Sequence, residues 1–141
     1  MKIAYTAHAT ATGGGREGHA KTDDGRVTVT LATPTEMGGS GKGTNPEQLF
    51  ATGYAACYLG AMRYAAGQAK ITMPEDASIL SHVSIGPRDD GKGFGLVVVM
   101  DVTLPGMSKE AAEDLAARGH VVCPYSHSIH GNVDVTTNVH V

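Results

Sequence analysis

The feature that most constrains the fold is a strong helix-start signal followed by a long uncharged segment. Asn45 can cap a helix, Pro46 suits its first position, and Gln48 can complete a capping box. The chain then runs without a charge from Gln48 to Met62, and the helix is predicted to end near Ala69. Because this helix is apolar on most sides, we expect a central helix buried by a sheet and by a second layer.

Three glycines recur at seven-residue intervals along this predicted helix. Gly53, Gly60 and Gly67 each destabilise a helix by roughly 0.5–1 kcal/mol relative to alanine. A groove for the close approach of another backbone would explain them, and a partner helix is the obvious occupant. The composition agrees, since 41% hydrophobic residues with 19 glycines and no tryptophan make a light core. We therefore expect one domain spanning residues 1–141 that forms a dimer.

The rest of the chain reads as strands with one further helix. Arg26–Leu31 and Asn132–Val141 alternate apolar and polar residues, and Asp23-Asp24-Gly25 is a hairpin turn signal. A second helix is predicted from a Ser108 cap to about Arg118, with Gly119 as its stop. The remaining predicted strands are Ala4–Thr12, His19–Thr22, Ser81–Gly86 and Gly95–Leu104. The fold class is therefore α+β with mostly antiparallel pairing.

Charge and hydropathy exclude several functions. The net charge of −3 and a pI near 6.1, without a basic stripe, argue against a nucleic-acid partner. The N-terminus lacks the apolar run of a signal peptide, and the Gln48–Met62 segment is shorter than the roughly 20 residues of a membrane span. We expect a soluble cytoplasmic protein. Two cysteines do not make a secreted disulfide scaffold, which favours redox or metal chemistry.

Cys57 lies inside the predicted central helix. It could be a small buried hydrophobe, which is common for free cysteine, or a nucleophile. A thiol with an ordinary pKa of about 8.5 is mostly protonated at neutral pH, so a nucleophilic role needs activation. The helix dipole cannot supply it, because Cys57 lies about three turns from the start. A cation must come from elsewhere in the fold.

Arg16 and Glu47 are the charged residues that could activate this thiol. Arg16 stands between glycines, and it is either a solvated loop charge or a guanidinium that holds a thiolate and a carboxylate at once. Glu47 is either an acid complementing the helix dipole or that carboxylate. Glu47 and Cys57 are separated by about 15 Å along one helix. If Arg16 bridges them, the simplest arrangement takes Glu47 or Cys57 from a second chain.

Cys123 is a second candidate nucleophile. It precedes Pro124 at a predicted helix start, where the helix N-terminus lowers a thiol pKa, so local physics does not decide which cysteine attacks. It could also be a buried structural residue. A rival arrangement places His120, Cys123, His127 and His130 on one helical face as zinc ligands, although Pro124 makes a continuous helix doubtful. A non-enzymatic metal-binding or redox-sensing domain is therefore an alternative function, and a redox-silent homologue is another.

Three segments of the sequence resemble a known family. They are GGGREGHAKTDDG, EMGGSGKGTNPEQLFATGYAACYLGAM and VVCPYSHSIHGNVDV. In order and spacing they resemble the organic hydroperoxide resistance proteins, a branch of the osmotically inducible protein C superfamily. The resemblance covers nearly the whole chain. Its TNPEQLFA–GYAAC block is highly specific, and CPYS is similar to the hydroperoxide branch.

The resemblance implies a fold, an activity and site residues. It implies an OsmC-like α+β fold with antiparallel sheets around a long central helix, as an intertwined homodimer. It further implies a thiol-dependent peroxidase that reduces organic hydroperoxides to alcohols without a bound cofactor or metal. By position, Cys57 matches the attacking cysteine, Cys123 the resolving one, and Arg16 with Glu47 the charged pair that tunes the thiolate. The family's usual reductant is a dihydrolipoyl group carried on a protein.

One segment departs from the family pattern. His127-Ser128-Ile129-His130 stands where many relatives have a sequence of the Asn-Ala-Thr-Arg type. The departure spares the four matched residues but alters the surroundings of Cys123. We expect it to affect disulfide formation or docking of the reductant. Apolar walls on the central helix, including Phe50, would favour alkyl or lipid hydroperoxides over hydrogen peroxide.

Overall fold

The computed structural model describes all 141 residues, and these form two compact units, Met1–Leu49 and Phe50–Val141. Each unit is described by itself. The α+β fold class is confirmed. The assignment of residues 1–141 to a single domain stays a prediction, as does the dimer.

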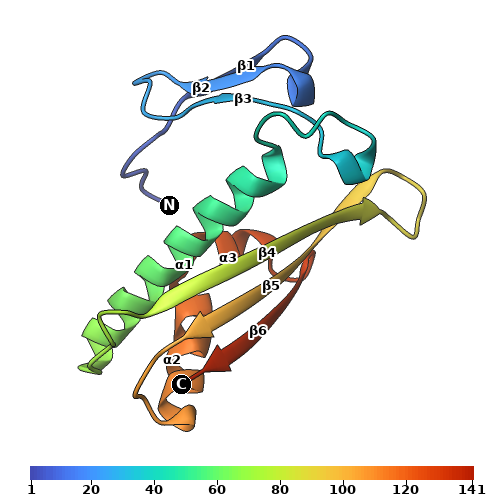
Figure 1. Ribbon diagram of the computed structural model, residues 1–141. Helices are drawn as coiled ribbons and strands as arrows, with labels where there is room; N and C mark the ends of the chain where they lie inside the picture. The colour runs from blue at the N-terminus through green and yellow to red at the C-terminus, as the bar shows by residue number, and fades with distance from the viewer. The chain divides into compact units, whose positions relative to one another are not determined.

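The first unit contains a three-stranded antiparallel sheet in the order β1-β2-β3 (Figure 1). Its strands are Ala9–Thr12, His19–Thr22 and Thr28–Thr30, and its short 3₁₀ turns are η1 (Gly15–Glu17) and η2 (Thr35–Met37). The predicted turn at Asp23-Asp24-Gly25 is confirmed, with Thr22 N–H donating to the Val27 carbonyl at 2.9 Å. The first and third strands are shorter than predicted.

The strands of the first unit bury no side chain. Across Met1–Leu49 the only buried residues are Gly18, Leu31, Ala32 and Asn45. Leu31 and Ala32 follow β3, and Ala32 N–H donates to the Thr44 carbonyl at 2.9 Å. The loop after β3 is thereby closed onto the residues that lead into the long helix.

The helix α1 (Pro46–Ala69) has 24 residues, as the sequence predicts. Its capping box is confirmed, because Gln48 N–H donates to Asn45 Oδ1 at 2.9 Å and Asn45 N–H donates to Gln48 Oε1 at 3.2 Å. These two bonds satisfy backbone donors that a helix start otherwise leaves unpaired. The helix starts in the first unit and continues through the second.

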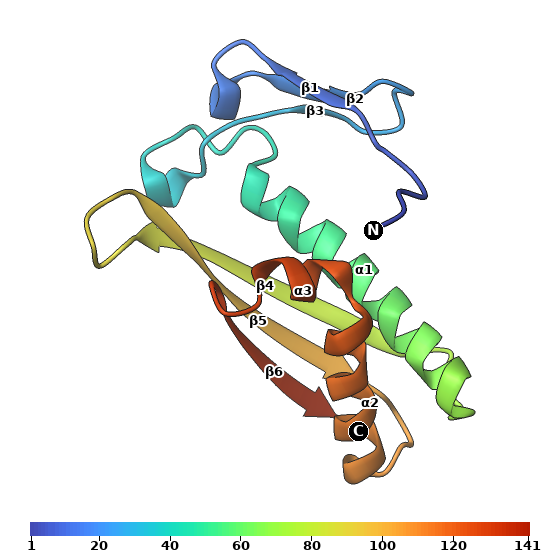
Figure 2. The same cartoon turned by 180° about the vertical axis from the view of Figure 1, so that it is seen from behind.

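The second unit places helices on one face of a three-stranded sheet in the order β4-β5-β6. The strands are Ser78–Pro87, Phe94–Thr103 and Asp134–His140, and the further helices are α2 (Lys109–Val122) and α3 (Pro124–Ile129). Figure 2 shows the three helices in front of this sheet. β4 and β5 pair antiparallel, whereas β6 lies parallel to β5, since α2 and α3 form the long crossover that a parallel pair requires.

The core of the second unit is formed between α1, α2 and one face of β5. Val98, Met100 and Val102 alternate along β5 and are fully buried. They pack with Tyr58 of α1 and Leu115 of α2 in one cluster. Only one side of α1 is buried in the single chain, so the expected second covering layer stays a prediction. No helix of the structure is both long and apolar enough to cross a membrane.

One prediction about a glycine was wrong. Gly119 does not end α2, which continues to Val122; it is buried, and a Cβ there would lie 2.5 Å from Met62 Cγ. Gly119 therefore permits close packing of α2 on α1. Of the three glycines of α1, Gly53 faces the Tyr125 ring of α3, whereas Gly60 and Gly67 face open space. Within the chain only Gly53 has a side chain against it, and the partner helix along the three glycines stays a prediction.

Candidate active site

Arg16 and Glu47 form a two-pronged ion pair in the first unit. Arg16 Nη1 donates to Glu47 Oε1 at 3.1 Å, and Nη2 donates to Oε2 at 2.5 Å. The Glu47 side chain is 13% exposed, so the carboxylate is largely withdrawn from water. Hydrogen bonding to Glu47 raises the pKa of the Arg16 guanidinium. The predicted contact between these two residues is present within one chain.

The geometry leaves one Arg16 donor unused. Arg16 Nε is buried and has no hydrogen-bond partner. Buried donors without an acceptor are uncommon and destabilising, which marks this N–H as available to an anion. The guanidinium thus holds a carboxylate with its two terminal nitrogens and retains a further donor on the adjacent edge.

The loop that carries Arg16 is positioned by close backbone packing. A Cβ on Gly18 would lie 1.9 Å from the Thr12 carbonyl oxygen, so only glycine fits. Glu17 Oε1 accepts a hydrogen bond from Thr33 N–H at 2.8 Å, and hydrogen bonds from the Thr33 side chain and backbone lower the pKa of Glu17. Glu17 and Gly18 therefore hold the C-terminal end of the short turn η1 in place.

The second unit brings the two cysteines together. Cys57 lies on α1, and Cys123 caps the start of α3. Both are free thiols, and Cys123 Sγ donates to Cys57 Sγ at 3.6 Å. Cys123 is fully buried, whereas Cys57 is half-buried. The two sulfur atoms are close to van der Waals contact, so a small movement of the two side chains would allow a disulfide.

The surroundings of Cys57 act on its pKa in both directions. Burial and the neighbouring Cys123 thiol raise the pKa of Cys57, and the Tyr125 backbone N–H, which donates to its sulfur, lowers it. The net effect is a raised pKa, and no cation contributes to it. The helix α3 thus supplies one amide donor to Cys57, which the sequence did not predict. The expected action of Arg16 on Cys57 joins residues of the two units and stays a prediction.

An aromatic cluster adjoins the cysteine pair. The Phe50 ring lies 5.7 Å from Tyr54 and 6.0 Å from Tyr125, measured between centroids. Phe50 is partly buried, and Tyr125 is 40% exposed. Because the Tyr125 backbone also contacts Cys57, this cluster forms an apolar surface beside the sulfur. Phe50 was predicted from the sequence as an apolar wall, whereas Tyr54 and Tyr125 were missed.

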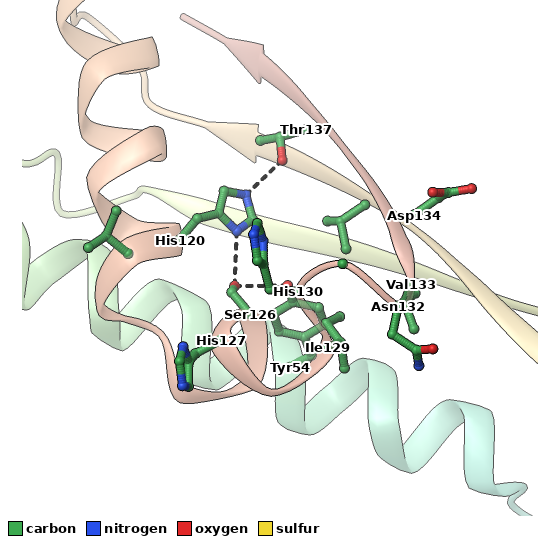
Figure 3. A pocket seen from close by; sticks show the side chains of 13 residues that line it. Tyr54, His120, Ser126, His127, Ile129, His130, Asn132, Val133, Asp134 and Thr137 are labelled. Carbon is green, nitrogen blue, oxygen red and sulfur yellow. Dashed lines mark hydrogen bonds between the residues drawn. The ribbon is translucent and has the colours of Figure 1, made fainter.

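A chain of polar side chains behind the cysteines was also missed. The Tyr54 hydroxyl lies 2.9 Å from Ser126 Oγ, which lies 2.9 Å from His120 Nδ1, and His120 Nε2 lies 2.8 Å from Thr137 Oγ1 (Figure 3). These four residues come from α1, α3, α2 and β6. They line a pocket of about 670 Å³. Sequence periodicity has no signal for such a network, because its members are distant along the chain.

The zinc site considered from the sequence is not assembled. Cys123 has an extended backbone between α2 and α3, so the four residues do not lie on one helical face. Both nitrogens of His120 are engaged by hydroxyl groups. The structure contains no group of three or more His, Cys, Asp or Glu side chains that could hold a metal ion.

Known proteins are similar to this chain in sequence and in structure. Residues 39–138 match the family model described as OsmC-like protein. An organic hydroperoxide resistance protein of Xanthomonas axonopodis is 52% identical over 96% of this chain and 94% of its own length. One of Bacillus subtilis is 40% identical over 93% of this chain and 94% of its own length. A solved organic hydroperoxide resistance protein of Legionella pneumophila has a TM-score of 0.93 at 48% identity and covers 99% of this chain and 100% of its own.

Proposed function

The chain belongs to the OsmC-like family, in its organic hydroperoxide resistance branch, and from this premise we propose that it is a two-cysteine thiol peroxidase. It reduces organic hydroperoxides to alcohols with electrons from an external dithiol. The reacting sulfur is Cys57, and Cys123 resolves the oxidised intermediate.

The observation that carries this proposal is the pair of reduced thiols 3.6 Å apart. A buried cysteine that is only structural needs no second thiol beside it. Two sulfurs at this distance can pass from thiols to a disulfide with little backbone movement. They are the only two cysteines in 141 residues, so their meeting across the fold favours redox chemistry.

The difference in exposure supports the assignment of roles. Cys57 is half-buried beside the aromatic cluster of Phe50, Tyr54 and Tyr125, so a hydroperoxide with an apolar chain can reach it. Cys123 is fully buried, and only its neighbour is within reach. The apolar surface beside Cys57 favours alkyl or lipid hydroperoxides over hydrogen peroxide, because transfer of their apolar chains out of water is favourable.

The thiolate requires a cation that the second unit does not provide. Burial raises the pKa of Cys57, and the Tyr125 amide only partly offsets this. We assign the cation to Arg16, whose Nε–H has no partner and whose fork is held by Glu47. An opposite charge near a thiolate lowers its pKa and restores reactivity at neutral pH.

The catalytic cycle has three steps. The Cys57 thiolate attacks the distal oxygen of ROOH, the O–O bond breaks, and the alkoxide takes a proton to leave as ROH. Cys57 becomes a sulfenic acid, which condenses with the Cys123 thiol to a disulfide and water. An external dithiol, for which we propose a dihydrolipoyl group on a partner protein, reduces this disulfide by exchange and is itself oxidised.

Thiol titration tests this cycle directly. One equivalent of cumene hydroperoxide per chain should remove both free thiols from the reduced wild-type protein and yield one equivalent of cumyl alcohol. Cys57→Ser should yield no alcohol. Cys123→Ser should yield one equivalent and then stop, with a sulfenic acid that dimedone traps. Retention of both thiols in the wild type would exclude the peroxidase.

Mixed dimers test where Arg16 acts. We propose that Arg16 of one chain serves Cys57 of its partner, because Glu47 and Cys57 are about 15 Å apart along one helix. A dimer that pairs Arg16→Ala with Cys57→Ser then retains one complete site and regains about half of the wild-type activity. If Arg16 serves its own chain, this mixed dimer is as inactive as its parents.

A further inference from the structure

The buried Cys123 thiol must lose its proton before it attacks, and the proposed cycle names no acceptor for that proton. This inference rests on the proposed function, in which Cys123 attacks the Cys57 sulfenic acid. The attacking species in such a step is the thiolate, not the thiol. Cys123 is fully buried, so bulk water does not reach its proton. The step therefore needs a group inside the protein that accepts a proton and releases it to solvent.

The polar chain Tyr54–Ser126–His120 has the connectivity for this task. At one end, Tyr54 and Cys123 lie in one buried cluster, against which Cys57 packs. Burial raises the pKa of Tyr54, and negative charge on Cys123 or Cys57 raises it further. In the middle, Ser126 Oγ is 2.9 Å from both the Tyr54 hydroxyl and His120 Nδ1. At the other end, His120 lines the 670 Å³ pocket.

The hydrogen bonds of this chain can run in either of two directions. In one direction Tyr54 donates to Ser126, Ser126 donates to His120 Nδ1, and Nε2 donates to Thr137. In the other direction every donor and acceptor is exchanged, so that Nδ1 donates to Ser126. Hydroxyl groups both donate and accept, and neutral imidazole has one nitrogen of each kind. A proton that enters at Tyr54 can therefore appear on His120 without any heavy atom moving far.

We propose that His120 is the proton acceptor for the resolving step and acts on Cys123 through Ser126 and Tyr54. It is a positioning residue that touches neither substrate nor sulfur. In the reduced protein the Cys123 S–H donates to Cys57 Sγ. Once Cys57 is oxidised, the Cys123 proton passes instead to Tyr54, the Tyr54 proton to Ser126, and the Ser126 proton to His120 Nδ1. The Cys123 thiolate then forms the S–S bond as hydroxide leaves Cys57, and the imidazolium proton converts that hydroxide to water by way of the pocket.

The environment of His120 keeps the acceptor ready at neutral pH. Burial lowers the pKa of His120, so its imidazole is uncharged and able to accept a proton. His120 also lines a second pocket, of about 520 Å³, and the titratable groups that share these two pockets come from α1, α2, α3 and β6. They are Tyr54 of α1, His127 and His130 at α3, Asp134 of β6, and Lys109 and Glu113 of α2. Tyr58 of α1 stacks on the ring with centroids 4.3 Å apart.

The test measures the two halves of the oxidation separately. Stopped-flow mixing with cumene hydroperoxide gives the rate of Cys57 oxidation, and quenching with a thiol-alkylating reagent gives the rate of disulfide formation. In His120→Asn, Ser126→Ala and Tyr54→Phe the disulfide step should slow on the order of 10²-fold, the usual loss when a general base is removed. The first step should keep its wild-type rate in His120→Asn and Ser126→Ala, whose side chains lie outside the aromatic cluster beside Cys57.

The pH profile separates proton transfer from a structural defect. In the wild type, disulfide formation should be flat near neutral pH and fall in acid as His120 becomes protonated. In the three variants it should rise tenfold per pH unit, because hydroxide must then remove the Cys123 proton. A structural defect instead lowers the rate at every pH and leaves the shape of the profile unchanged.

Tyr58→Phe is the matched control. It removes an equally buried hydroxyl, which donates to the Ala116 carbonyl at 2.7 Å, but retains the ring that stacks on His120. Its disulfide step should keep the wild-type rate and profile. Wild-type rates and profiles in all three chain variants would overturn the relay, and so would a profile of unchanged shape. If no sulfenic acid forms in Cys123→Ser, the proposed peroxidase fails instead.

Discussion

The two three-stranded sheets of this protein differ in what they bury. No side chain of β1, β2 or β3 is buried, whereas β5 has a continuous buried face at Val98, Met100 and Val102. The first sheet is held by its backbone ladders. The second is covered on one face by helices and shares their apolar core (Figure 2). Burial of apolar area is the dominant favourable term in folding, so the second unit accounts for most of the stability of the single chain.

The proposed chemistry follows the same division. The charged pair Arg16–Glu47 belongs to the first unit, near the surface of the chain, where a guanidinium remains hydrated in part. The thiols belong to the second unit, where burial shields Cys123 from solvent but also raises the pKa of Cys57. A buried thiol needs an external cation, and Arg16, which is partly exposed and paired with Glu47, can supply one without burying an unpaired charge.

The largest effect should come from shortening core side chains. Leu115→Ala removes a fully buried side chain and should lower the free energy of unfolding by about 2–5 kcal/mol. The matched change Val29→Ala on β3, where the side chain is only partly buried, should cost less than about 1 kcal/mol. Urea denaturation measures both. Equal losses would contradict the unequal burial of the two sheets.

The next effect concerns the ion pair of the first unit. Arg16→Ala should raise the pKa of the Cys57 thiol and lower the peroxidase rate at neutral pH by roughly 10-fold or more, because a compensating charge is lost. The measurement is the rate of alkylation of Cys57 as a function of pH. Arg26→Ala is the control, since Arg26 is 88% exposed in the same unit. An unchanged alkylation curve in Arg16→Ala would exclude its proposed role.

A smaller effect should follow from uncapping α1. Asn45→Ala removes the Oδ1 acceptor of the Gln48 N–H, one of the two bonds of the capping box, and should lower the free energy of unfolding by about 1 kcal/mol. Ser108→Ala removes the single cap of α2, a 3.3 Å bond from Ala111 N–H, and should cost less. Urea melts of the two variants rank the caps. A larger loss in Ser108→Ala than in Asn45→Ala would contradict the larger contribution of the α1 cap to the free energy of unfolding.

The smallest effect is a pH dependence on the outer face of the second sheet. Asp101 accepts hydrogen bonds from Asn138, His140 and His82, and these lower its pKa to about 2. An unfolded aspartate has a pKa of about 3.9, so Asp101 stabilises the fold above that pH and loses this contribution as pH falls toward 2. The Tm difference between wild type and Asp101→Asn should therefore shrink over this range. A difference that stays constant down to pH 2 would rule the contribution out.

The predictions from capping and turn motifs are confirmed, because these structures depend only on residues that are neighbours in the sequence. The bounds of α1 follow from a capping box and a proline at its start, which act within one turn. The predicted turn at Asp23-Asp24-Gly25 is confirmed for the same reason. Gly119 was misread as a helix stop, because a sequence does not reveal that Met62 lies against it. The parallel pairing of β6 was also beyond reach, since it depends on the path of a crossover.

The sequence by itself determined the helix that carries Cys57, the α+β class and the family. These depend on local backbone preferences and on motifs that are continuous along the chain. Only the tertiary structure decided that Cys57 contacts Cys123, 66 positions away in the sequence, and that Arg16 pairs with Glu47, 31 positions away. It alone assembled Tyr54, Ser126 and His120 into one chain of hydrogen bonds. Contacts between such distant residues depend on how helices and strands pack, and no local propensity encodes that packing.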